Sequence, residues 1–227
     1  MNTFLYFFLG FGYLCLLIWG IVPAKKHGLF NLTNVLLLVI LGLVYDNLMI
    51  AFGRFIGEGN VLESLNVVRF WLHALFTPTL ILFAWSICFR IGLPWAQKTF
   101  WKVLAWLLTI GLILYELLTS IKGLELKPNW ENGVLTYENA AQSDTPVMVI
   151  LITLVLGIVS IIFIKKFRYF WLFIGTLFMI LGGILAIWIK SFPIMNVLEF
   201  LLIVSLLMTK QFQTESKNSP QISNQLE

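Results

Sequence analysis

Seven long apolar segments dominate this chain, and each has about the length that a helix needs to cross a bilayer. A crossing helix requires about 20 predominantly apolar residues. The segments lack the alternation of polar and apolar residues that is typical of barrel strands, so we predict helices. Their predicted bounds are 4–22, 32–53, 68–89, 101–120, 146–164, 169–189 and 193–208.

The composition also indicates a lipid environment, because 59% of the 227 residues are hydrophobic and only 11% are charged. A water-soluble domain of this size would need more polar residues to cover its surface. We therefore predict an all-α polytopic membrane protein whose single transmembrane domain comprises residues 1–209. The remaining segment, 210–227, is rich in Gln, Ser and Asn and is predicted to be a disordered cytoplasmic tail.

The distribution of Lys and Arg predicts the orientation of the seven helices. One side of the predicted bundle carries ten of them: Lys25, Lys26, Arg90, Lys98, Lys102, Lys165, Lys166, Arg168, Lys210 and Lys217. The other side carries five: Arg54, Arg69, Lys122, Lys127 and Lys190. The positive-inside rule places the richer side in the cytoplasm, with the amino terminus outside the cell. We predict a multi-pass protein of the cell membrane, and these loop charges do not indicate a nucleic-acid partner.

The longest connection between predicted helices is 122–145, on the outer side. It contains an Asn132–Gly133 turn signal. A connection of this length is either a functional lid or a disordered connector, and the sequence leaves both open.

Four predicted helices contain ionisable side chains at a similar depth. Such residues are costly in a membrane, by about 2.5–3.5 kcal/mol on insertion scales, so each is a functional hypothesis. A rise of about 1.5 Å per residue places all four in a slab roughly 6 Å thick in the outer leaflet. We predict that they form the catalytic group of a shared pocket: Asp46, His73, Glu116 and Glu199.

Helical spacing adds polar and aromatic neighbours to this pocket. Arg69, His73 and Thr77 are four residues apart and share one face, as do Asn196 and Glu199 at a spacing of three. Polar faces turn toward the bundle interior or a water-filled cavity, because lipid cannot satisfy them. The predicted substrate-binding residues are Tyr45, Asn47, Arg54, Arg69, Trp71, Thr77, Tyr115 and Asn196.

This set of residues suits acid–base chemistry on a lipid or isoprenoid. A carboxyl group that holds its proton can act as a general acid toward an olefin, epoxide, vinyl ether or ester, with His73 or a second carboxylate as the base. We predict no cofactor. We also predict no metal site, because His73 is the one histidine within a predicted helix and no H-x-x-x-H pair occurs.

Two other interpretations remain open at this stage. A transporter, channel or sensor would use the same pocket to bind a polar or cationic ligand from outside. Alternatively, the carboxylates pair with Arg54, Arg69 and His73 only to hold the helices together. Such pairs contribute about 0.6–2 kcal/mol in membranes, which scarcely offsets burying three carboxylates, and this favours a functional pocket.

An acidic residue in the second predicted helix and another in the seventh, Asp46 and Glu199, give the chain a resemblance to a known family. In length and seven-helix layout it resembles the small integral-membrane terpene cyclases of meroterpenoid pathways. That family has Glu in the second helix and Asp in the seventh, whereas the two acids are exchanged here. The resemblance implies acid-started cyclisation of an isoprenoid, with Asp46 as the proton donor and Glu199 as its partner.

Overall fold

The computed structural model of this protein describes residues 2–28, 31–131, 133–140, 147–188 and 192–218. The fold is mostly helical, which confirms the all-α class in outline. The long helices are α1 (Asn2–His27), α2 (Val35–Ile56), α3 (Asn60–Phe76), α4 (Leu80–Arg90), α5 (Thr99–Glu116), α6 (Val147–Phe167), α7 (Trp171–Trp188) and α8 (Ile194–Asn218). The short elements are η1 (Leu32–Asn34), η2 (Thr77–Thr79), η3 (Leu117–Ile121), β1 (Leu126–Glu131) and β2 (Val134–Asn139).

Within the described ranges, six helical segments are long and apolar enough to cross a membrane, and α7 is a shorter apolar helix. The six are Asn2–Lys25, Leu32–Ile56, Asn60–Arg90, Thr99–Ile121, Val147–Phe167 and Ile194–Ser216. Large apolar side chains stand exposed along these helices, including Phe8, Phe55, Leu107 and Ile158. Exposed apolar surface on this scale is expected of helices that face lipid rather than water.

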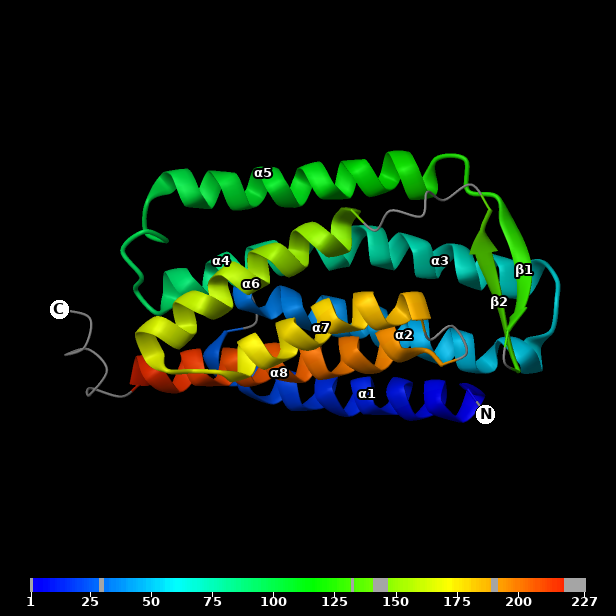
Figure 1. Cartoon of the computed structure of the whole chain (residues 1–227), viewed down its shortest axis with the longest axis horizontal. Coiled ribbons are helices and arrows are strands. Elements are labelled where there is room, and N and C mark those ends of the chain that lie inside the picture. The colour runs from blue at the N-terminus through cyan, green and yellow to red at the C-terminus, as the bar shows by residue number, and fades with distance from the viewer. Residues whose placement is uncertain (1, 29–30, 132, 141–146, 189–191, 219–227) are drawn as a thin grey trace.

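The helices lie roughly along the long axis of the molecule, as Figure 1 shows. The amino terminus and the hairpin formed by β1 and β2 lie at one end, which we call the hairpin end. The carboxyl-terminal end of α8 lies at the opposite end, which we call the tail end. The most extensive helix contacts join α1 to α2 and α7 to α8, while α5 packs mainly against α4 at the edge of the bundle.

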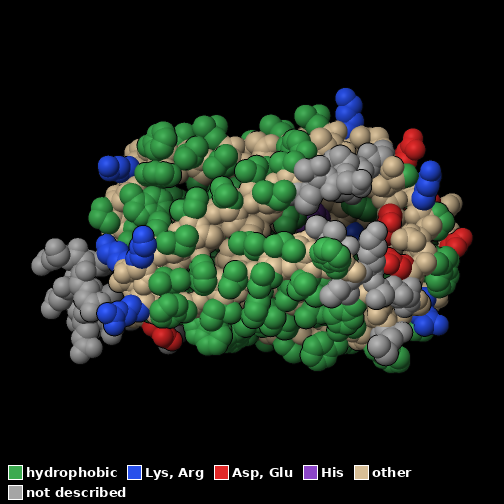
Figure 2. Space-filling model, viewed as in Figure 1, with side chains coloured by type: hydrophobic (Ala, Val, Ile, Leu, Met, Phe, Trp, Pro, Cys, Tyr) green, Lys and Arg blue, Asp and Glu red, His purple; other side chains and the backbone are tan. Residues whose placement is uncertain are grey.

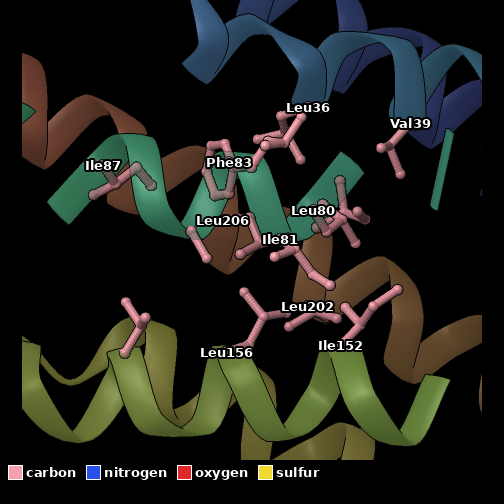
Figure 3. Packing of buried hydrophobic residues seen from close by; sticks show 14 of the residues in the cluster. Leu36, Val39, Leu80, Ile81, Phe83, Ile87, Ile152, Leu156, Leu202 and Leu206 are labelled. Carbon is pink, nitrogen blue, oxygen red and sulfur yellow. The ribbon is translucent and has the colours of Figure 1, made fainter. Parts of the chain in front are cut away.

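Helix α4 forms the centre of the apolar core. Its residues from Leu80 to Cys88 are all buried, as expected of a helix that is hydrophobic on every side. Figure 3 shows α4 between α2 and α6, with Phe83 beside Leu36 and with Leu156 on the opposite side. Side chains of α8 complete this cluster. The core therefore holds α2, α4, α6 and α8 together and fixes the helix faces that surround the candidate site.

A break at Pro78 separates α3 from α4. Proline lacks a backbone N–H and disrupts the helical ladder at this position, and the chain passes through the short turn η2 instead. The helical segment nevertheless continues on both sides, so that Asn60–Arg90 is a single candidate for crossing the membrane. It begins earlier than the predicted segment 68–89 because polar residues after Asn60 also join the helix.

The long connection predicted at 122–145 contains an antiparallel hairpin. Its register places Glu131 opposite Val134, and Gly133 in the turn adopts a φ of +82°, a conformation that glycine adopts at no steric cost. On the inner face, Leu135 and Tyr137 pack against Leu62 of α3. The hairpin thus covers the ends of the helices, while residues 141–146 of the same connection lie outside the described residues.

The predicted start of a disordered tail at Lys210 differs from the structure, in which α8 continues to Asn218. The ring of Phe212 stacks on Tyr169 at 4.5 Å and approaches Phe163 and Phe167 at 6.4 and 6.0 Å. This aromatic packing stabilises the last turns of α8. The polar composition of these residues alone predicts no helix. The rest of the predicted tail, 219–227, lies outside the described residues.

The contact between α2 and the hairpin can be tested at Gly53. A methyl group there would collide with the backbone carbonyl of Leu135, which cannot move without displacing the hairpin. We expect Gly53→Ala to destabilise the protein by about 1–3 kcal/mol, the usual cost of overpacking. The measurement is the thermal unfolding midpoint in detergent.

Gly111→Ala is the matched control, because a methyl group on this exposed α5 glycine meets nothing within 4 Å. Its unfolding midpoint should stay unchanged or rise, since alanine favours the helix by roughly 0.5–1 kcal/mol. Equal midpoints for the two variants would contradict the hairpin contact.

Candidate functional site

An ion pair joins α2 to α3 near the hairpin end. The Nε atom of Arg69 donates to Oδ1 of Asp46 at 2.8 Å. The two side chains are partly buried, with 16% of Arg69 and 26% of Asp46 exposed. The contact links α2 to α3 and holds the Asp46 side chain in place.

Asn66 connects the ion pair to the hairpin. Its Oδ1 atom accepts from Nη1 of Arg69 at 2.6 Å and from the backbone N–H of Tyr137 at 3.3 Å. Only 1% of Asn66 is exposed. Sequence analysis missed this residue, although its position three before Arg69 places both on one helix face. The network fixes Arg69 from two sides and fastens β2 to α3.

A cavity of about 120 Å³ lies between the α3–α4 segment, α6, α7 and α8. Four predicted site residues line it: His73, Thr77, Asn196 and Glu199. The remaining lining is mostly apolar: Leu80, Val149, Ile152, Thr153, Met179, Met195 and Leu202. The structure therefore brings together two of the four predicted catalytic residues around one space.

His73 faces this cavity with its orientation set by Thr77. The Thr77 hydroxyl and His73 Nδ1 are 3.2 Å apart, within hydrogen-bond distance. His73 is exposed, Glu199 is partly exposed, and both line the cavity. In Figure 2 a histidine side chain is visible inside a recess of the surface.

Asp46 and Glu116 lie near this cavity but do not line it. Both are close enough to His73 for their charges to act on it, and Asp46 is likewise within range of Glu199. Glu116 is buried at the end of α5, where its Oε2 accepts from the Ser120 hydroxyl at 2.8 Å. The four acidic and basic groups thus share one region, with His73 and Glu199 at the cavity itself.

Tyr13 of α1 also belongs to this region, and sequence analysis did not select it. It is fully buried, and its ring meets Phe200 edge-on at 5.1 Å. Its hydroxyl has no hydrogen-bond partner among the residues that the structure describes. Asp46 and Glu199 both lie within electrostatic range of this hydroxyl. In the sequence, the phenol oxygen of Tyr13 near the middle of the first apolar segment was the one indication of a role for this residue.

The other predicted substrate-binding residues are placed away from this cavity. The Tyr45 hydroxyl donates to the Leu65 carbonyl at 3.0 Å, which ties α2 to α3. Asn47 is buried and donates to a carbonyl of its own helix. Three further residues do not line the cavity either: Arg54, Trp71 and Tyr115.

The exposure of Arg54 and Trp71 explains why neither side chain lines the cavity. Arg54 is exposed, with its guanidinium 5.6 Å from the ring of Phe55, and Trp71 is 42% exposed. Side chains of this kind at a helix surface snorkel or anchor at the interface rather than join an interior site.

In the described part of the chain, no three His, Cys, Asp or Glu side chains gather closely enough to hold a metal ion. No protein-family model, curated protein or solved structure matches the chain. The assignment of the site therefore depends on the residues and contacts of this chain.

The ion pair predicts energetic coupling between Asp46 and Arg69. In a double-mutant cycle of Asp46→Asn and Arg69→Gln, the pair should show a coupling of about 0.6–1.7 kcal/mol, the range of polar interactions between membrane helices. The measurement is the free energy of unfolding in detergent for the two single variants and the double variant.

Arg54→Gln is the control, because this exposed arginine does not pair with Asp46 in the structure. The changes in the free energy of unfolding caused by Arg54→Gln and by Asp46→Asn should therefore add, with no coupling between them. Strict additivity of the Asp46 and Arg69 variants would show that the pair contributes nothing to stability.

Proposed function

We propose that this chain is a multi-pass protein of the cell membrane with seven crossing helices and its amino terminus outside. Helix α7 has 18 residues and therefore a length of about 27 Å, close to the roughly 30 Å of a bilayer core. The tail side carries ten Lys and Arg residues in the sequence and the hairpin side five, which supports a cytoplasmic tail end under the positive-inside rule. Figure 2 shows Asp and Glu side chains mainly at the hairpin end.

We infer that the chain is an enzyme that performs acid–base chemistry on a lipid or isoprenoid. The observation that carries this inference is one cavity lined by Glu199 and His73 within otherwise mostly apolar walls. An apolar lining favours a hydrocarbon substrate, while the carboxyl and imidazole groups supply an acid and a base.

The size of the cavity limits what part of a substrate it holds. Its volume of about 120 Å³ is smaller than the roughly 300–1,000 Å³ of a typical ligand pocket. We therefore propose that only the reacting end of an elongated molecule enters it. The hydrocarbon tail would then lie along the exposed apolar faces of the helices.

Glu199 is our proposed proton donor, rather than Asp46 as the terpene cyclase resemblance implies. A donor must be free to pass its proton to the substrate, and the Asp46 carboxyl group is engaged by Arg69. Within the described ranges, Glu199 forms no ion pair. It faces the cavity directly, whereas Asp46 does not.

The proposed reaction is a proton relay through the substrate. Glu199 transfers its proton to an olefin or epoxide, and the resulting cation rearranges or cyclises. His73, oriented by Thr77, removes a proton from the product cation. Return of that proton from His73 to Glu199 restores both groups. The Asp46 carboxylate, fixed by Arg69, stabilises the positive charge that develops nearby.

This function predicts that Glu199→Gln and His73→Gln abolish the reaction while the protein still inserts and folds. Glutamine preserves the size of glutamate and one acceptor oxygen, but its amide group cannot release a proton as an acid. The measurement is mass spectrometry of lipids from cells that express each variant. A species that depends on the wild-type protein should disappear in both variants.

Glu125→Gln, which makes the same chemical change at an exposed loop position, should leave that species unchanged. An identical lipid profile for Glu199→Gln and the wild type would rule out this enzyme. In that case, flux of a cation into sealed vesicles that depends on Glu199 would assign the cavity to a transporter or channel instead.

A further inference from the structure

A second polar region lies at the tail end, in a part of the chain where the sequence suggested no site. A cavity of about 410 Å³ opens there between α1, η1, the end of α4 and the last turns of α8. Polar side chains supply much of its lining, including Arg90, Lys210, Gln213 and Thr214. It shares no lining residue with the cavity at His73 and Glu199.

Lys210 is the most unusual residue of this cavity. It is 7% exposed, and its Nζ atom is buried without a hydrogen-bond partner in the described part of the protein. A buried ammonium is costly unless an anion or several acceptors surround it. Burial of Lys210 follows from the continuation of α8, which carries the residue against α1 rather than into a solvated tail.

Arg90 presents a second cation to the same space. Its Nε atom is also buried and lacks a hydrogen-bond partner among the described residues. Two cationic side chains therefore line the same cavity, Arg90 from α4 and Lys210 from α8. Each has a buried N–H donor that makes no hydrogen bond to the described residues. Among the described lining residues the single acid is Glu215, which is exposed.

An adjoining cavity of about 720 Å³ extends this region toward α5. The two cavities share Gly28, Asn31 and Arg90, so the guanidinium group borders both. The adjoining cavity adds Lys102 as a further cation and Trp85 and Phe89 as apolar wall. A ligand with an anionic group at Arg90 would thus have room for a larger body.

We propose that the tail-end cavity binds the phosphoryl group of an anionic ligand through Lys210 and Arg90. Phosphoryl oxygens accept several hydrogen bonds at once, and the planar guanidinium of arginine binds them in pairs while lysine adds a point charge. The cavity lies at the tail end of the helices, which is the depth of lipid headgroups if these helices cross a bilayer as proposed above. A phospholipid headgroup and a soluble phosphate ester share this chemistry.

The test uses the full-length protein in a neutral detergent with three probes: inorganic phosphate, dioctanoyl phosphatidate and dioctanoylglycerol. The readout is the rise in melting temperature with probe concentration, which yields an affinity. Phosphatidate should stabilise the wild type, and dioctanoylglycerol, which lacks the phosphoryl group, should not. Stabilisation by inorganic phosphate as well identifies a soluble phosphate site, and stabilisation by phosphatidate alone identifies a lipid headgroup site.

Lys210→Met and Arg90→Gln should each weaken phosphatidate binding roughly 10- to 100-fold, the effect of losing one charge-assisted hydrogen bond. Lys166→Met removes the same charge from an exposed position on α6 and should leave the affinity unchanged. Glu199→Gln should also leave it unchanged, which separates this site from the acid–base cavity.

Three results would overturn the proposal. The first is no stabilisation of the wild type by phosphate or phosphatidate. The second is equal weakening by Lys166→Met and Lys210→Met, which would indicate attraction to net charge alone. The third is an unchanged phosphatidate affinity in Lys210→Met with a lower melting temperature, which would assign Lys210 a structural role.

Discussion

The ion pair between Arg69 and Asp46 is the interaction on which the hairpin end of this structure depends. A carboxylate between membrane helices needs a partner, and Arg69 provides one at 2.8 Å. Because Asn66 accepts from both Arg69 and the backbone of β2, the same contact also fixes the hairpin over the helix ends. This arrangement leaves Glu199 as the acidic residue that faces the neighbouring cavity.

Much of the helical framework could be predicted from apolar segment length, and residue spacing correctly placed Thr77 beside His73. The partner of Asp46 could not be predicted, because Arg54, Arg69 and His73 were all available. Only the rotation and packing of the helices decide between them. Asn66 was missed because its second partner comes from a hairpin far away in the sequence. Tyr13 was missed because a tyrosine in an apolar segment is usually part of the packing, and no acidic or basic side chain of the same segment accompanies it.

At the tail end, a tertiary contact determines where α8 ends, and composition alone could not predict it. The residues after Met208 are polar enough to suggest a disordered tail. Helix α8 nevertheless continues, because Phe212 packs against an aromatic surface formed by α6 and Tyr169. In the same extension of α8, Lys210 is buried and lines a cationic cavity. The molecule thus has an acid–base region toward its hairpin end and a cationic region at its tail end, separated by the apolar core around α4.

The central claim is that Glu199 carries the reactive proton while Asp46 is held as an ion-paired carboxylate. Dicyclohexylcarbodiimide, an apolar reagent that modifies protonated carboxyl groups, tests this claim directly in protein reconstituted into lipid. Peptide mass spectrometry should find the adduct on Glu199 and not on Asp46, with labelling of Asp46 appearing only in an Arg69→Gln variant. Labelling of Asp46 but not Glu199 in the wild-type protein would contradict the account.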